Sequence, residues 1–491
     1  MSPVPYSIYI HVPFCRQACS YCDFYFITRQ ELIPAYTEAL IRDIRSSADT
    51  FVDGLTLQPM CSESAAEKSR NPSTQKVRER RPHPSDQQLE NTPVSHTPEA
   101  QLSKPYLSSV YFGGGTPSRL PARTIERILE TIHRHHGLDS VQEITMEANP
   151  DDLTSLQAVR DLKNAGVTRL SMGVQSFNPD LLQFMNRAHS ARQAEQSLDF
   201  IQQADFKTYT VDLIYGNPGQ TLRQLETDIK TFLSWNPPHI SAYALTIEPG
   251  TRLGKALQLG RLTEPDDHEV ARHMQLTVNL LADAGLHRYE VSNFALPGHE
   301  AVHNSSYWNH TSYLGIGPGA HGLQLRSTPD GRLTGALRWS NPADVRAYIQ
   351  MHKEKTSTRR EFTHGTETEI LSPTQLAEER LLMGLRTSDG VQTGELLERY
   401  GYQLSEKQLR YLEKMRSEGY FHPLSDTKFT TREAEQRLPA AEGGPAEVEQ
   451  RLGEVADNPS EVKQDPESSQ LLRLTDAGLA LADRLTLELL S

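Results

Sequence analysis

The sequence has few cysteines, no long apolar run and no excess of positive charge. Four cysteines in 491 residues exclude a disulfide-stapled scaffold, and no apolar run reaches the roughly 18 residues of a membrane span. With 50 basic and 63 acidic residues the net charge is −13, which disfavours a nucleic-acid binder. The first residues resemble neither a secretory signal nor a transit helix. We therefore expect a cytoplasmic protein of roughly two to four domains.

Short runs rich in Val, Ile, Tyr and Thr alternate with amphipathic stretches through the first half of the chain. The expected strands cover residues 7–12, 108–112, 142–147, 168–173, 207–214 and 239–245. The expected helices cover residues 121–135, 153–165, 190–203 and 221–233. Strands that alternate with crossover helices predict a parallel sheet, and this length predicts an α/β fold with a partial (β/α)6 barrel.

Two polar stretches interrupt this pattern, and we expect both to be disordered insertions. Residues 58–105 contain seven Pro and seven Ser, and residues 431–469 are rich in Glu, Ala, Gln and Pro. Cys61 in the first stretch is expected to be an incidental thiol. The resulting organisation is a barrel over residues 1–325, a connecting segment over 326–370 and a winged-helix-like domain over 371–491. The local acidity of that last domain favours packing or partner docking over DNA binding.

Three of the four cysteines, Cys15, Cys19 and Cys22, crowd together directly after the first expected strand. Three thiolates in one loop hold three corners of a [4Fe–4S] cluster and leave one iron open to an exogenous ligand, whereas an electron-transfer cluster has four. The alternatives are a chance cluster or a zinc site completed by a histidine. Zinc sites typically pair their cysteines across a long gap, which is absent here. The pattern therefore favours an iron–sulfur cluster.

Glycines and polar side chains follow the ends of the next expected strands. Glycines at the end of the second strand let a backbone approach a ligand and offer it N–H groups, although Gly-Gly-Gly is often only a turn. The C-terminal ends of barrel strands carry the chemistry, so we expect these residues to share a site. Each one alone also fits a turn or a strand-end cap, and the arginine a surface salt bridge. The candidates are Gly114, Gly115, Thr116, Glu147, Gln175, Arg187 and Asp212.

Four motifs together resemble those of the radical S-adenosylmethionine proteins. They are Tyr-Ile-His-Val-Pro-Phe-Cys-x3-Cys-x2-Cys, Gly-Gly-Gly-Thr-Pro, Ser-Met-Gly-Val-Gln-Ser-Phe and Asp-Leu-Ile-Tyr-Gly. More narrowly, they resemble the oxygen-independent coproporphyrinogen III oxidase family. The resemblance implies a [4Fe–4S] cluster on the three cysteines, with its open iron chelated by S-adenosylmethionine. The positions that it implies for S-adenosylmethionine contacts are Tyr9, Gly114 and Glu147 and, for a second molecule in the oxidases, Tyr21, Gly115, Thr116, Gln175, Arg187 and Asp212.

Two departures separate the chain from the oxidase branch. Oxidases have a further cysteine where this chain has Phe24, and they have an N-terminal extension where only 14 residues precede Cys15. Both features resemble the heme chaperone branch. So does the motif His303-Asn-Ser-Ser-Tyr307-Trp308, which implies His303 as a heme ligand, since neutral imidazole binds heme iron and aromatic side chains pack beside a macrocycle. The alternative is a loop histidine beside aromatics that seal the barrel. His321 is expected to be structural.

We therefore expect a heme chaperone that binds heme and S-adenosylmethionine beside the cluster. Radical machinery is expected, but coproporphyrinogen oxidase activity is not. The resemblance implies three partners: a hemoprotein acceptor such as a respiratory-chain protein, an electron donor, and a reversible second copy. The alternatives are an oxygen-independent coproporphyrinogen III oxidase, which converts two propionates to vinyls, and a catalytically silent iron–sulfur docking protein.

Overall fold

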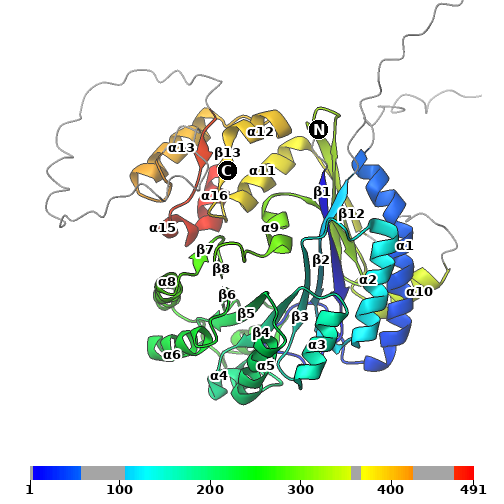
Figure 1. Ribbon diagram of the computed structural model, residues 1–491. Coiled ribbons are helices and arrows are strands. Elements are labelled where there is room, and N and C mark those ends of the chain that lie inside the picture. Colours follow the sequence, from blue (N-terminus) through cyan, green and yellow to red (C-terminus); the bar gives the residue numbers. More distant parts are fainter. Residues whose placement is uncertain (1–3, 57–104, 355–366, 424–468) are drawn as a thin grey trace, which may run out of the picture.

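The computed structural model describes residues 4–56, 105–354, 367–423 and 469–491 (Figure 1). Cys61 and almost all of the two expected insertions, residues 58–104 and 431–468, lie outside the described residues. In the part of the chain that is described, no helix combines the length and apolarity needed to cross a membrane.

All six expected strands are confirmed, and they are parallel neighbours in chain order. They are β1 (Pro5–Val12), β2 (Tyr106–Gly114), β3 (Glu143–Ala148), β4 (Arg169–Gln175), β5 (Thr208–Tyr215) and β6 (His239–Ala244). The inward- and outward-facing residues of these strands are both largely buried, as in a sheet covered by helices. Each fully buried large apolar side chain contributes about 1.5–3 kcal/mol to folding.

The four expected helices are also confirmed, and helices α1 and α4 add to them. The helices are α1 (Ile33–Thr56), α2 (Ala122–His136), α3 (Leu156–Asn164), α4 (Pro179–Phe184), α5 (Ala191–Gln203) and α6 (Leu222–Leu233). Both α5 and α6 begin with a capping box, formed by Ser190 with Gln193 and by Thr221 with Gln224. Helix α3 begins later than expected because the Ser155 hydroxyl accepts the N–H of Ala158 and caps the helix there.

The sheet continues beyond the expected barrel on both sides. On one side β9 (Ser312–Ile316) pairs in parallel with β1, and antiparallel strands β10 (His321–Ser327), β11 (Leu333–Ser340) and β12 (Glu367–Leu371) follow. Along the chain, helix α10 (Val345–Glu354) connects β11 to β12, and it packs on α1. The segment 326–370, expected to be a connector, thus contributes two strands to the main sheet.

On the other side β6 pairs with β8 (Asn293–Ala295), which pairs with β7 (His287–Arg288). Helices α7 (Arg252–Gln258) and α8 (Asp267–Asp283) precede these strands, and the short helix α9 (Val302–Trp308) follows them. Figure 1 shows α9 between the barrel strands and the C-terminal helices.

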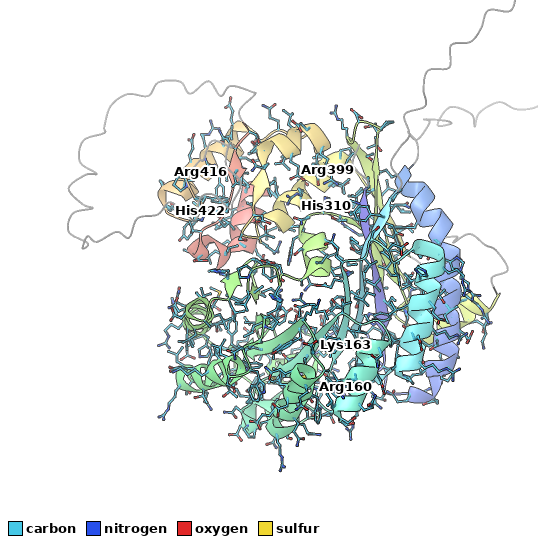
Figure 2. The ribbon with its side chains drawn as sticks, in the orientation of Figure 1. Arg160, Lys163, His310, Arg399, Arg416 and His422 are labelled. Carbon is cyan, nitrogen blue, oxygen red and sulfur yellow. The ribbon has the colours of Figure 1, made fainter. Side chains whose placement is uncertain are left out.

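The C-terminal part is a helical cluster with a small two-stranded sheet, and its core is continuous with side chains of β10, β11 and β12. Its elements are α11 (Pro373–Gly384), β13 (Val391–Gln392), α12 (Thr393–Tyr400), α13 (Glu406–Ser417), β14 (Leu471–Leu472), α15 (Asp476–Leu479) and α16 (Ala482–Leu490). The chain ends in two short helices, because α15 ends at Leu479 and α16 begins at Ala482, and a Cβ atom on Gly478 would lie 2.1 Å from the Tyr420 carbonyl. His310, labelled in Figure 2, joins this part to the barrel through a 3.0 Å hydrogen bond between its Nδ1 and the Tyr400 hydroxyl.

Candidate functional site

A cavity of about 490 Å³ opens at the carboxyl ends of the parallel strands, where the site was expected. Most of the expected site residues line it, although they come from five different parts of the chain. Tyr9 and His303 do not line it. The expected residues that do are Cys15, Cys19, Tyr21, Cys22, Gly114, Gly115, Thr116, Glu147, Gln175, Arg187 and Asp212.

The loop after β1 carries the three cysteines and is fixed at both ends. The Cys15 N–H donates to the Ile27 carbonyl at 2.9 Å, and the Ser20 N–H donates to the Met185 carbonyl at 3.0 Å. All three thiols are partly exposed and face the cavity. Among the described residues no three His, Cys, Asp or Glu side chains converge on one point, as the ligands of a single ion do. A [4Fe–4S] cluster fits this loop better, because each of its thiolates binds a different iron.

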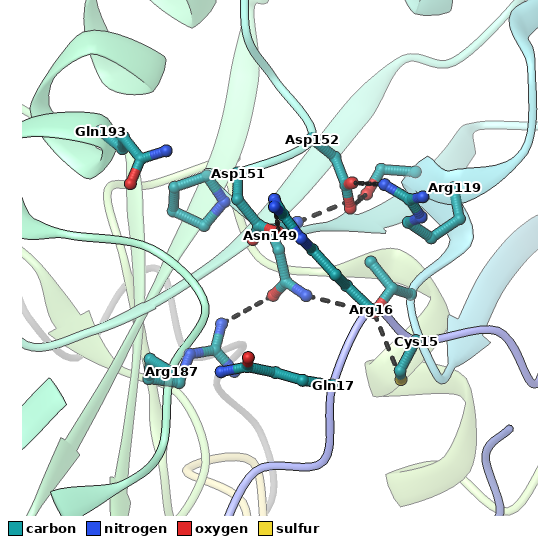
Figure 3. Close-up of polar contacts among 12 residues, drawn as sticks. Cys15, Arg16, Gln17, Arg119, Asn149, Asp151, Asp152, Arg187 and Gln193 are labelled. Carbon is teal, nitrogen blue, oxygen red and sulfur yellow. Dashed lines mark hydrogen bonds and ion pairs between the residues drawn. The ribbon is translucent and has the colours of Figure 1, made fainter. Parts of the chain in front are cut away.

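A chain of hydrogen bonds joins Cys15 to Cys19 through three side chains, and Figure 3 shows its part from Cys15 to Arg187. The Thr116 hydroxyl donates to the Cys15 sulfur at 3.4 Å and accepts the Asn149 amide at 3.1 Å. The Arg187 guanidinium donates to the Asn149 oxygen at 2.7 Å and to the Cys19 sulfur at 3.2 Å. Donors aimed at sulfur stabilise a thiolate and raise the reduction potential of a cluster bound to it.

Arg187 is a central residue of the site rather than a surface ion pair. Besides its bonds in the chain above, it donates to the Gly173 carbonyl at 2.6 Å and to the Tyr21 hydroxyl at 3.3 Å. Its Nε atom is buried and has no partner among the described residues. The guanidinium therefore holds the cysteine loop against the end of β4 and keeps one donor unused.

Burial raises the pKa of the Cys15 thiol to about 11 and that of the Cys22 thiol to about 12. Without metal these two thiols are neutral at pH 7. Iron binding must displace their protons, so cluster assembly is expected to release protons and to weaken as the pH falls.

Two carboxyl groups, those of Glu147 and Asp212, also line the cavity. Burial raises the pKa of Glu147 to about 7 and that of Asp212 to about 6, and the charge of Asp212 adds to the effect on Glu147. The Tyr111 hydroxyl and the Gly114 N–H donate to Glu147 at 2.9 and 3.1 Å. A cationic ligand in the cavity would stabilise both carboxylates.

The glycine run is used differently from the expectation. Its N–H groups were expected to face a ligand, but the Gly114 N–H donates to Glu147 and the Gly115 N–H donates to the Val12 carbonyl at 2.9 Å. Gly114 has a φ of +103°, and a Cβ atom there would lie 2.4 Å from the His11 ring. Glycine is therefore required at this position for the close packing of β2 on β1.

Gln175 ends β4 with features typical of a binding residue. Its φ of +71° is unusual for a residue other than glycine, and the ladder to β5 shifts register there. Its side-chain oxygen is buried and has no partner among the described residues. A buried amide oxygen without a donor is costly, so a ligand that donates to it would bind favourably.

His303 lies on α9, outside the cavity, and both of its ring nitrogens are hydrogen-bonded. Nδ1 is 2.9 Å from the Ser109 hydroxyl and Nε2 is 2.9 Å from the Tyr307 hydroxyl. The ring is only 1% exposed and stacks on Tyr111 at 4.9 Å between centroids. This geometry does not support the expected role of His303 as a heme ligand, because neither nitrogen is available to iron.

Burial lowers the pKa of His303 to about 3. The pH dependence of stability therefore tests whether this histidine is buried and neutral in the folded protein. The unfolded chain takes up a proton near pH 6.5 and the folded chain does not, so His303 costs stability as the pH falls below 6.5. We expect this cost to be about 1.4 kcal/mol per pH unit, and to be absent in His303→Gln. Urea unfolding of both proteins between pH 7.5 and 5 measures it. The exposed His268 provides the control variant His268→Gln, and equal pH slopes for wild type and His303→Gln would contradict the buried, neutral state.

Asn149 is the site residue that sequence reasoning missed. It bonds both Thr116 and Arg187, and it lines the cavity. The available signal was its place just after β3, two residues beyond Glu147, where an amide side chain precedes a proline.

Comparison with known proteins gives consistent matches. Residues 95–232 match the model of the Radical SAM superfamily. The chain is 32% identical to the heme chaperone HemW of Bacillus subtilis over 87% of this chain and 96% of that protein. It is also 32% identical to HemW of Lactococcus lactis, over 79% and 83% of the two chains. Coproporphyrinogen III oxidase from Escherichia coli has a similar fold, with a TM-score of 0.65 at 18% identity over 99% of this chain and 90% of that chain.

Proposed function

The chain belongs to the HemW branch of the radical S-adenosylmethionine family, and from this membership we propose that it binds heme and delivers it to hemoproteins. The observation that carries the proposal is the match to the Bacillus subtilis chaperone over 96% of that protein's length. The likeness to the oxidase is one of fold alone, since it is 18% identical.

The cavity fits the two cofactors of the family. Cys15, Cys19 and Cys22 would hold a [4Fe–4S] cluster, which with S-adenosylmethionine supplies one-electron chemistry when bound. Two features of the wall suit the cationic sulfonium compound: the carboxyl groups of Glu147 and Asp212 attract positive charge, and Gln175 and Arg187 offer an oxygen and an N–H without partners among the described residues. We propose that Tyr21, Gly114, Gly115 and Thr116 complete this lining.

Tyr9 is proposed to act from behind the cavity rather than in it. Its ring packs 6.1 Å from that of Tyr111, whose hydroxyl donates to Glu147. Tyr9 thereby supports the residue that orients the Glu147 carboxylate.

Partners and location follow from the same proposal. We propose a respiratory-chain hemoprotein as acceptor, an external electron donor for the cluster and a reversible homodimer, with no role for nucleic acid. We also propose that the protein works in the cytoplasm, because a reducing compartment keeps three clustered thiols available to iron.

A hemin titration tests the proposal. We expect the anaerobically reconstituted protein to bind hemin with a Soret band distinct from that of free hemin, and to pass heme to an apo-hemoprotein such as apomyoglobin. The same protein, given coproporphyrinogen, S-adenosylmethionine and dithionite, is expected to form no protoporphyrinogen. Absence of the Soret band would refute the chaperone proposal, and formation of protoporphyrinogen would point to the oxidase instead.

A further inference from the structure

A second cavity, of about 580 Å³, lies beside β1 among the strands that extend the sheet. Its walls come from β1, the end of the cysteine loop, α9, β9, β10, the end of β11 with the turn that precedes α10, and the start of β12. Its volume is within the roughly 300–1,000 Å³ of small-molecule and cofactor sites. Nothing in the proposed binding of the cluster and S-adenosylmethionine uses this cavity.

Five aromatic side chains contribute to the lining of the second cavity. Four tyrosines, Tyr9, Tyr25, Tyr307 and Tyr313, contribute flat apolar surface with polar tips. Phe24 adds a ring that is 63% exposed, although an apolar side chain of this size is usually buried. These rings offer flat surfaces against which a planar molecule with both apolar and polar edges can pack.

One imidazole on this wall is available to a metal. His321 begins β10, is exposed and faces the second cavity, and neither of its ring nitrogens has a hydrogen-bond partner among the described residues. In contrast, the other histidine of the wall, His11, is hydrogen-bonded at Nε2 to the Tyr25 carbonyl and at Nδ1 to the Tyr9 hydroxyl. His11 and His303 are thus both occupied, and His321 is not.

The backbone holds His321 in place. A Cβ atom on Gly315 would lie 1.8 Å from the His321 carbonyl, so only glycine at that point lets β10 approach β9 this closely. The Asn341 N–H donates to the neighbouring Ala320 carbonyl at 2.8 Å. The expectation that His321 is structural therefore holds for its backbone, while its side chain is presented to the cavity.

We propose that the second cavity is the heme site and that His321 is the axial ligand of the heme iron. The inference rests on the proposed heme chaperone function and assigns its site. The macrocycle would lie against Phe24 and the tyrosines. Among the described residues the wall also carries the carboxyl groups of Asp23 and Glu367 and no Lys or Arg, so the propionate edge of a bound heme would face solvent, away from both.

His303 then has a positioning role. Its Nε2 is bonded to the hydroxyl of Tyr307, which lines the second cavity, and its ring stacks on Tyr111, which lines the first. The His-Asn-Ser-Ser-Tyr-Trp segment thus shapes the wall between the two cavities and leaves iron ligation to His321.

Phe24 also lies between the two cavities. It and Asp23 directly follow Cys22, and both line the two cavities. A heme in the second cavity would therefore lie next to the cluster loop. Phenylalanine at this position, where the resembling oxidases have a cysteine, gives that heme an apolar contact.

Hemin titration of the full-length chain, followed by absorption spectroscopy, tests the assignment. We expect His321→Ala to weaken hemin binding by roughly 100-fold, at least as much as the loss of an outer-shell partner at a metal site. We expect His321→Cys to shift the Soret band to that of thiolate-ligated heme, a change that a structural role would not produce. His303→Gln is expected to weaken binding while retaining the histidine-ligated spectrum. His268→Ala, at an exposed position on α8, is the control.

The outcomes separate the two proposals. If wild-type protein shows no bound-hemin spectrum, the chaperone function itself fails. If wild type binds hemin but His321→Ala and His321→Cys keep its affinity and spectrum, the function stands and the site assignment is overturned. Loss of the histidine-ligated spectrum in His303→Gln alone would overturn it as well.

Discussion

We expect the protein with Cys15→Ser, Cys19→Ser and Cys22→Ser, reconstituted without oxygen, to contain neither iron nor acid-labile sulfide. Wild type should contain about four irons per chain and the broad absorption of a [4Fe–4S] cluster. The reason is that serine hydroxyls stay protonated and do not replace thiolates as ligands to iron–sulfur clusters. Iron and sulfide analysis with absorption spectra measures the result.

The fourth cysteine supplies the matched control. Cys61→Ser removes a thiol that was assigned no ligand role, so this variant should retain full iron and sulfide. Retention of the cluster by the triple variant, or its loss from Cys61→Ser, would remove the basis for every cofactor assignment above.

The second large effect is a loss of stability, which we expect when a buried ion pair is broken. Arg169 is 1% exposed, and its guanidinium donates to Glu143 at 3.0 Å, to the Thr210 hydroxyl at 3.1 Å and to the His299 carbonyl at 2.8 Å. Glu143 in turn accepts the His303 N–H at 3.1 Å. Arg169→Met leaves that carboxylate buried without its partner, and we expect a loss of about 3–5 kcal/mol in the free energy of unfolding.

A surface pair gives the comparison. Arg127 and Glu38 lie 2.6 Å apart but are 50% and 47% exposed, so Arg127→Ala should cost less than about 1 kcal/mol. Because Arg169→Met with Glu143→Leu removes the buried charge as well, the double variant should recover part of the loss. Urea unfolding measures both losses of free energy. Equal losses for Arg169→Met and Arg127→Ala would show that the buried pair, through the bond from Glu143 to the His303 N–H, does not anchor α9.

The sequence pattern was sufficient to predict the strands that are buried on both faces and the helices that begin with a capping residue. The six parallel strands carry buried side chains on both faces, and Ser190 and Thr221 mark the helix starts where they were expected. The four strands β9 to β12 were missed for physical reasons. β9 is only five residues long and is followed at once by the turn Gly317-Pro318-Gly319, and β12 is an edge strand whose Glu and Thr side chains are exposed.

The site was predicted as a set of strand ends, and eleven of the expected residues do line one cavity. The sequence did not reveal which hydrogen-bond partners each polar side chain has within the folded protein. The pattern that names His303 carries no information on its bonds to Ser109 and Tyr307, because those partners come from distant parts of the chain. The same holds for Asn149, whose importance follows from its contacts with Thr116 and Arg187.

The position of β1 between β2 and β9 has a consequence for biosynthesis. Tyr6 is opposite Ser312 in the ladder, so one edge of the first strand has no neighbour until nearly the whole barrel sequence has left the ribosome. Contacts so distant in sequence form late, since a long loop must close first. The thiol-bearing loop that leaves β1 is thus framed only near the end of translation, and iron is expected to enter a finished chain rather than a growing one.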